Sequence, residues 1–395
     1  AMFELGRSYV RSGDVEKASG CYDRLIREVK DSTFVARSLI ELGMIARNKG
    51  EYELSLSRYK TVVEKMPLSG YADDALLAIE SIYQSMNEPR KYLDYIDSIG
   101  KSSLKTEDEK EMMIFNAAEQ IYLSENYQKA LVSLQSYLDS YPQGAKVPQA
   151  WFYMAECYKS LGKADQACDY YVKVMESGDG SYSELACLNF ANLAYGLQRY
   201  EDAWRAYVSL GEMASLENNR YAAMLGMMRS SFRARLYEES LSSADKVLAD
   251  SRSDADIRRE AEYVKAKSFL ATSRRDEAYA IFARLASWPG TPEGAEAAYL
   301  MILDSYDRGD FEEVETKVYS FSDSSTGQTY WLAKAFIVLG DSFVERGEYE
   351  QAEATFRSIL DGYQASAAGD DVHDNVTMRL DKLKEIMQQA AAQNE

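Results

Sequence analysis

The strongest constraint on the fold is a pattern of residues that recurs about every 37 residues along the chain. The pattern consists of a large residue, a pair such as Leu5-Gly6, Leu42-Gly43, Met154-Ala155 or Leu339-Gly340, and an aromatic residue. After a break it continues with a small residue and a second aromatic one, although no single unit is decisive. The small residue, replaced by a larger one in two irregular units, occupies Ala18, Ser55, Tyr92, Ala130, Ala167, Ala203, Ser240, Ala278, Val314 and Ala352. From Ala18 to Ala352 the chain advances 334 residues in nine intervals between successive units. Ten such units predict a repeat array rather than independent globular domains.

Each unit is expected to form two helices, which we call helix A and helix B. Apolar residues recur at spacings of three and four, as on the buried face of an amphipathic helix. Several breaks between the two helices carry a glycine, which suits the left-handed backbone that often ends a helix; these are Gly13, Gly50, Gly162 and Gly347. The two helices would then fold back as an antiparallel pair, with small residues allowing their backbones to approach.

The pattern resembles the tetratricopeptide repeat family, and the resemblance covers nearly the whole chain. The period is longer than the standard 34 residues. Units such as Tyr141-Pro142-Gln143-Gly144 leading into Ala150-Trp151-Phe152 are similar to the longer repeats of bacterial cell-envelope proteins, including outer-membrane assembly lipoproteins and Tol-Pal-associated factors. The resemblance implies an all-α, right-handed superhelical solenoid of about ten helical hairpins with a C-terminal capping helix.

We expect the solenoid to occupy residues 1–366, and a capping helix and tail to occupy residues 367–395. The units would lie near 1–33, 34–70, 71–111, 112–147, 148–181, 182–219, 220–256, 257–291, 292–328 and 329–366. A solenoid must cover its last apolar face, and the final segment places four apolar residues on one face: Val376, Leu380, Leu383 and Met387. Asn87, before Pro89, and Asp374 are predicted to cap the N-termini of helices.

The sequence offers little catalytic or metal-binding chemistry. The only histidine, His373, follows Asp370 and Asp371 and precedes Asp374, but this segment reads as a loop that leads into a helix. No glycine-rich phosphate loop occurs. We therefore expect no catalytic residue, no metal and no cofactor. The cysteines are interpreted as small apolar helix residues, although pairing of two of them, Cys157 with Cys187, stays open; the four are Cys21, Cys157, Cys168 and Cys187.

The net charge of the chain indicates which class of partner it can bind. The chain has 64 acidic and 45 basic residues, a net charge of −19, which argues against nucleic acid and favours basic protein partners. No apolar run approaches the length of a membrane span.

Residues 1–5 lack a signal-peptide pattern, so we expect a fragment of a longer protein whose missing N-terminal region could contact the array. From the resemblance we expect a periplasmic or outer-membrane-associated location, with a cytoplasmic one as the alternative.

The resemblance also implies a concave groove lined by helix A, where a peptide would bind. One set of helix A positions is apolar in every unit: Phe3, Ile40, Leu77, Phe115, Phe152, Leu188, Leu225, Tyr263, Tyr299 and Ile337. These apolar residues could instead pack between neighbouring units, and the sequence leaves both roles open. Combined with later aromatic residues and nearby polar ones, the pattern predicts these partner-binding residues: Phe115, Asn116, Tyr122, Phe152, Tyr153, Asn189, Asn192, Tyr195, Arg229, Phe232 and Arg233.

The function expected from these features is that of a non-catalytic scaffold that binds a peptide or partner protein, in a bacterial envelope assembly or transport system. The alternative is a regulatory or sensor module of a larger cytoplasmic protein or enzyme. A third class, a superhelical hydrolase of cell-wall glycan, would need a catalytic domain that this sequence does not contain.

The assigned register predicts that the helix B small site cannot accept a large side chain. Ala203→Leu is expected to lower the free energy of unfolding by about 1–3 kcal/mol, because added methylenes overpack a close helix pair. Thermal unfolding measures the change, and an unaltered melting temperature would contradict the register.

Overall fold

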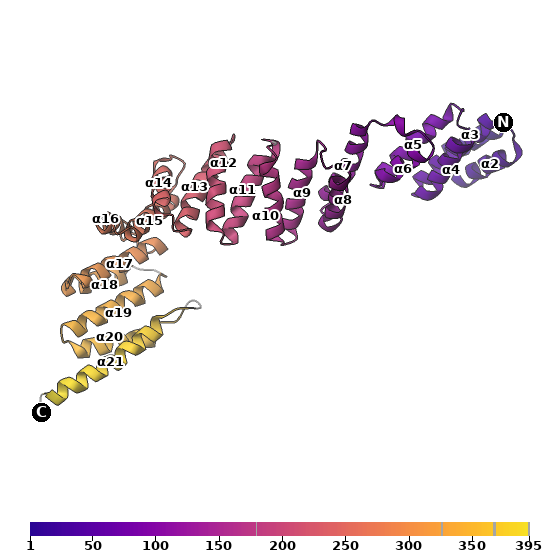
Figure 1. Ribbon diagram of the computed structural model, residues 1–395. Helices are drawn as coiled ribbons and strands as arrows, with labels where there is room; N and C mark the ends of the chain where they lie inside the picture. The colour runs from indigo at the N-terminus through magenta and orange to yellow at the C-terminus, as the bar shows by residue number, and fades with distance from the viewer. Residues whose placement is uncertain (179, 325–326, 366–368, 394–395) are drawn as a thin grey trace. The chain divides into compact units, whose positions relative to one another are not determined.

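The computed structural model describes residues 1–178, 180–324, 327–365 and 369–393, and in these residues it contains helices and no strand. The chain divides into two compact units, residues 1–186 and 187–395, each of which is considered by itself. Within each unit, consecutive helices lie side by side in chain order (Figure 1). The all-α class and the helical hairpins predicted from the repeat are therefore confirmed.

The first unit contains five hairpins and the beginning of α11. Its helices are α1 (Met2–Arg11), α2 (Val15–Glu28), α3 (Ser32–Asn48), α4 (Tyr52–Lys65), α5 (Tyr71–Ser85), α6 (Pro89–Ser98), α7 (Glu107–Leu123), α8 (Tyr127–Ser140), α9 (Val147–Ser160), α10 (Ala164–Glu176) and α11 (Gly180–Gly196), with a short 3₁₀ turn, η1 (Ser102–Leu104), before α7. Odd-numbered helices are helix A of their repeat, and even-numbered ones are helix B.

The second unit begins inside α11 and ends with a lone helix. Its further helices are α12 (Tyr200–Met213), α13 (Glu217–Arg233), α14 (Tyr237–Ala249), α15 (Ala255–Ala271), α16 (Arg275–Leu285), α17 (Pro292–Asp307), α18 (Phe311–Ser324), α19 (Thr329–Glu345), α20 (Tyr349–Gly362) and α21 (Val372–Gln393).

In three of the hairpins, a glycine of helix A meets a large ring of the helix B that follows it. A Cβ added at Gly43 would lie 2.7 Å from the ring of Tyr59, and one at Gly340 would lie 2.4 Å from the ring of Phe356. Real Cβ atoms do not approach that closely, so the glycine permits the contact. The helix B small residue Ala203 is fully buried, as its predicted role requires.

A left-handed residue ends helix A in every one of the ten repeats. Five of these residues are glycines, with φ between 72° and 81°, namely Gly13, Gly50, Gly162, Gly309 and Gly347. The other five carry side chains, with φ between 56° and 62°, namely Asn87, Glu125, Gln198, Arg235 and Ser273. The turn geometry is therefore kept even where the sequence does not supply glycine.

The predicted capping helix packs as expected. Val376, Leu380 and Leu383 of α21 are buried in the cluster formed with α19 and α20. Arg379 also forms an ion pair with Asp341 of α19, in which its Nε donates to both carboxylate oxygens, at 2.8 and 2.9 Å. Residues 366–368, where the predicted boundary falls, and residues 394–395 of the predicted tail lie outside the described residues.

Pro89 lies in the first turn of α6, as the sequence predicts, but Asn87 and Asp374 do not cap their helices. Asn87 is the left-handed residue after α5, and the N-cap position of α6 is Glu88. Asp374 lies inside the first turn of α21, because that helix begins at Val372. In both cases the polar side chain stands one or two positions from the true helix start, and propensity alone does not resolve such a shift.

Cys157 and Cys187 are not joined by a disulfide, so the possibility left open by the sequence is not realised. Cys157, Cys168 and Cys187 are buried, and Cys187 Sγ donates a hydrogen bond to the Ala206 carbonyl at 3.1 Å. Burial raises the pKa of the Cys157 thiol to about 12 and that of Cys187 to about 11. These thiols are packing residues with little thiolate character.

The left-handed positions give a stability test. Glu125→Gly should raise the free energy of unfolding by about 1 kcal/mol, because glycine removes the Cβ strain of a positive φ. Gly50→Ala, where no atom lies within 4 Å of the new Cβ, should lower it by a similar amount. Calorimetry on both variants checks the opposite signs; a shift in the same direction for both would contradict the assignment.

Candidate partner-binding surfaces

In the first unit, the predicted site residues on α7 and α9 meet around one carboxylate. Tyr153 Oη donates a hydrogen bond to Glu119 Oε1 at 2.7 Å, and Gln149 Nε2 donates to the same oxygen at 3.1 Å. The ring of Tyr153 stacks on that of Tyr122, with centroids 4.3 Å apart. Both tyrosines are partly buried, so the pair forms a fixed aromatic platform between two helices A.

The surroundings of this platform suppress ionisation of its phenols. Burial raises the pKa of Tyr122 to about 12. Burial, followed by the hydrogen bond to the Glu119 carboxylate, raises the pKa of Tyr153 further. Both phenols therefore stay neutral in the physiological range, and the pair serves as a hydrogen-bonded contact surface rather than as an acid or base.

Two of the predicted aromatic residues lie in the core instead of at the surface. Phe115 is 1% exposed and meets Tyr137 edge-on, with ring centroids 5.3 Å apart. Phe152 is 6% exposed and lies between Tyr171 and Tyr182. For these two positions the alternative role, packing between helices, is the one that the structure supports. Phe115 and Phe152 both pack against the ring of Tyr153, and because they are buried they are not available to a partner.

Asn116 lies beside a small pocket lined largely by amide side chains. This pocket, of about 230 Å³, lies between the end of α5, the start of α6 and α7, and its polar lining residues are Gln84, Asn87, Asn116 and Gln120. Gln84 and Gln120 were not predicted. Gln120 could have been found from the sequence, because it follows Asn116 by four residues and so shares its helix face.

The predicted residues of the second unit form a separate polar and aromatic group. Asn192 accepts a hydrogen bond from Tyr207 Oη at 2.6 Å. Tyr195 meets Tyr200 edge-on at 5.2 Å, and the guanidinium of Arg233 lies 5.7 Å from the centre of the Tyr200 ring. Asn189 is half-buried, and Phe232 packs at the margin of the core of α13, α14 and α15.

Arg229 is already engaged by its own chain. Its Nε and Nη2 atoms each lie 2.7 Å from a carboxylate oxygen of Glu260 on α15. This bidentate hydrogen bond is the main cause that raises the pKa of Arg229. Arg233, which is exposed, is therefore the better placed of the two arginines to meet a partner's carboxylate.

His373 has a structural position. It lies in the first turn of α21, its Nε2 is 3.1 Å from the carbonyl oxygen of Tyr363, and its ring meets that of Tyr363 edge-on. Among the described residues, no group of three or more His, Cys, Asp or Glu is placed to hold a metal ion. None of the described helices is both long and apolar enough to cross a bilayer.

The hydrogen bond at the platform predicts unequal effects for two tyrosines in one stack. Tyr153→Phe should lower the free energy of unfolding by about 1–2 kcal/mol, because it removes a partly buried bond to a carboxylate. Tyr122→Phe, for which the structure gives no side-chain hydrogen bond, should change it by less than about 0.5 kcal/mol. Urea unfolding of both variants tests this; equal losses would remove the role assigned to Glu119.

Two segments of the chain match family models of the tetratricopeptide repeat, residues 3–67 and residues 149–177. No curated protein sequence matches the chain. Similar solved structures include a tetratricopeptide repeat protein from Parabacteroides merdae, at 14% identity over 87% of this chain and 97% of that one, with a TM-score of 0.27. Another is pilF of Pseudomonas aeruginosa, at 16% identity over 58% of this chain and 98% of that one, with a TM-score of 0.29.

Both matched segments coincide with helical hairpins of the structure, α1 to α4 and α9 to α10. Their close helix pairs and left-handed turns recur along the rest of the described chain. Residues 3–67 and 149–177 are therefore tetratricopeptide repeats.

Proposed function

We propose that this protein is a non-catalytic scaffold that binds a partner protein or peptide on the exposed faces of its helices A. Tetratricopeptide repeats generally mediate interactions between proteins. The observation that carries the proposal is that α7 lines an amide-rich pocket with the end of α5 and the start of α6, and also shares a stacked tyrosine pair with α9. Such groups suit an extended peptide, whose backbone needs donors and acceptors and whose side chains need apolar anchors.

The exposed stripe of α7 is the proposed contact surface in the first unit. Met112, Asn116, Gln120 and Leu123 follow one another at spacings of three and four, and all four are exposed. Asn116 and Gln120 each offer a donor and an acceptor, while Met112 and Leu123, which are 41% and 60% exposed, offer apolar surface at either end. A peptide lying along this stripe would gain both backbone hydrogen bonds and side-chain burial.

The proposed surface of the second unit has a different character. Tyr195, Tyr200 and Arg233 combine rings with an exposed cation, and aromatic and arginine residues dominate the energetics of many interfaces. The net charge of −19 would favour basic partners elsewhere on the surface by long-range attraction.

For the compartment, we propose a bacterial envelope assembly or transport system, at the periplasm or the outer membrane. The long repeat period and the unit that begins at Tyr141 support this proposal through their resemblance to envelope proteins. The alternative, a regulatory module of a larger cytoplasmic protein, predicts a different distribution. Fractionation of source cells with an antibody against residues 1–395 separates the two: recovery with the cytoplasmic fraction alone would reject the envelope proposal.

The α7 surface predicts a specific loss of binding. Asn116→Ala with Gln120→Ala should reduce partner recovery at least tenfold when the immobilised chain captures proteins from an extract of source cells, because the two amides that α7 contributes to the pocket are removed. The control is Gln128→Ala with Gln135→Ala, which removes two exposed amides from α8. Undiminished capture by the α7 variant, or equal losses in both variants, would move the binding site away from α7.

A further inference from the structure

Grooves between neighbouring helices B form a second kind of surface in this chain. Helices A of neighbouring hairpins contact one another, as α3 and α5 do, or α17 and α19. Three pockets lie instead between consecutive helices B, with a helix A as the floor: between α2 and α4 over α3, between α6 and α8 over α7, and between α16 and α18 over α17. Helices that meet along one edge diverge along the other, which leaves a groove there.

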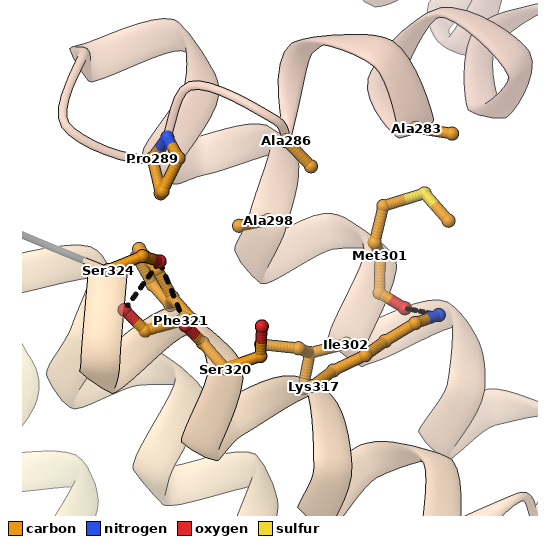
Figure 2. A pocket seen from close by; sticks show the side chains of 10 residues that line it. All are labelled: Ala283, Ala286, Pro289, Ala298, Met301, Ile302, Lys317, Ser320, Phe321 and Ser324. Carbon is orange, nitrogen blue, oxygen red and sulfur yellow. Dashed lines mark hydrogen bonds between the residues drawn. The ribbon is translucent and has the colours of Figure 1, made fainter.

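The groove over α17 shows how such a site is closed by its own chain. Lys317, at its edge, turns inward (Figure 2) and donates hydrogen bonds to Ser305 Oγ at 2.9 Å and to the Met301 carbonyl oxygen at 3.4 Å. Its Nζ also lies 3.2 Å from Glu313 Oε1. The ammonium group of Lys317 is therefore already paired with groups of the same chain. The other residues that line this groove are mostly apolar or carry hydroxyl groups.

The groove over α3 differs because its cations are not neutralised in the same way. Its volume is about 470 Å³, and its apolar lining residues are Ile26, Val35, Leu39, Leu54 and Met66. Around them lie Lys30, Arg58 and Lys65. Among the described residues, Lys30 and Lys65 form no ion pair, whereas Arg58 has only a 3.4 Å contact with Asp23.

The first two repeats carry a small positive net charge, unlike the chain as a whole. Residues 1–66 contain 12 basic and 10 acidic residues, a net charge of +2. The other 329 residues contain 33 basic and 54 acidic residues, a net charge of −21. The groove over α3 thus lies in a stretch whose net charge does not repel anions, and Lys30 and Lys65 line it.

We propose that the groove between α2 and α4 binds an acidic segment of a partner protein, with one large apolar side chain seated on Leu54 and carboxylates paired with Lys30 and Lys65. The recess has room for a side chain, and Leu54, which is 46% exposed, gains from being covered. A recessed apolar floor between two cationic rims fits a peptide better than a flat anionic bilayer. This site is independent of the surface proposed on α7.

Fluorescence anisotropy with the full chain tests the site. The probe is a labelled nonapeptide that has one leucine between two runs of four glutamates. Lys30→Glu with Lys65→Glu should weaken its binding at least tenfold, and Leu54→Ser should weaken it about fivefold. The matched control, Arg11→Glu with Lys49→Glu, makes the same charge change at exposed residues outside the groove and should leave binding within twofold.

Two further probes separate the partner classes. A peptide with serine in place of leucine should bind at least fivefold more weakly, and phosphatidylserine vesicles should not bind. Equal binding of the serine peptide, equal loss in the Arg11 and Lys49 control, or binding of vesicles without binding of the peptide would each overturn the proposal. Asn116→Ala with Gln120→Ala should leave nonapeptide binding unchanged, which keeps this test separate from that of the α7 surface.

Discussion

The fold depends on how closely helix A and helix B of one repeat approach each other. At Gly43 and Gly340 the aromatic ring of helix B occupies the space where a Cβ would otherwise lie. That contact fixes the position of the ring and, through it, the distance between the two backbones. Because each hairpin buries its core against its neighbours, this local distance is propagated to the next repeat. Packing in such an array is therefore set by many similar contacts and not by one central core.

The same spacing accounts for both kinds of surface in the molecule. Helices A approach their neighbours closely enough for side chains of successive repeats to pair directly, as Glu119 does with Tyr153. Such pairs hold neighbouring helices A against one another, whereas Asn116 and Gln120 of the α7 stripe are exposed. Helices B stand further apart and leave grooves. Whether a groove is closed by its own chain then depends on single side chains such as Lys317.

The periodicity of the sequence was sufficient to predict the helical hairpins, the glycine turns and the final packed helix, because those features depend on residue size and spacing. It did not predict the five left-handed residues other than glycine, since tertiary packing imposes that conformation against local preference. It also could not separate surface from core among aromatic residues on helix A. Phe115 and Tyr122 lie seven residues apart on one face of α7, yet Phe115 is buried and Tyr122 is half-buried, because Tyr122 lies in the last turn of the helix beside the exposed Leu123.

The pairs that join one helix A to the next differ from repeat to repeat. Arg229 meets Glu260, Lys267 and Tyr263 meet Glu296, and Asp341 meets Arg379. Hairpins with the same backbone are thus not interchangeable parts. If two of them were exchanged in order, carboxylates would face carboxylates or apolar residues at the new seams, with the cost of a partly buried charge left unpaired. These side-chain pairs therefore specify the order of the repeats. A chain with its repeats in a different order should fold less stably than a chain from which a terminal repeat has been removed.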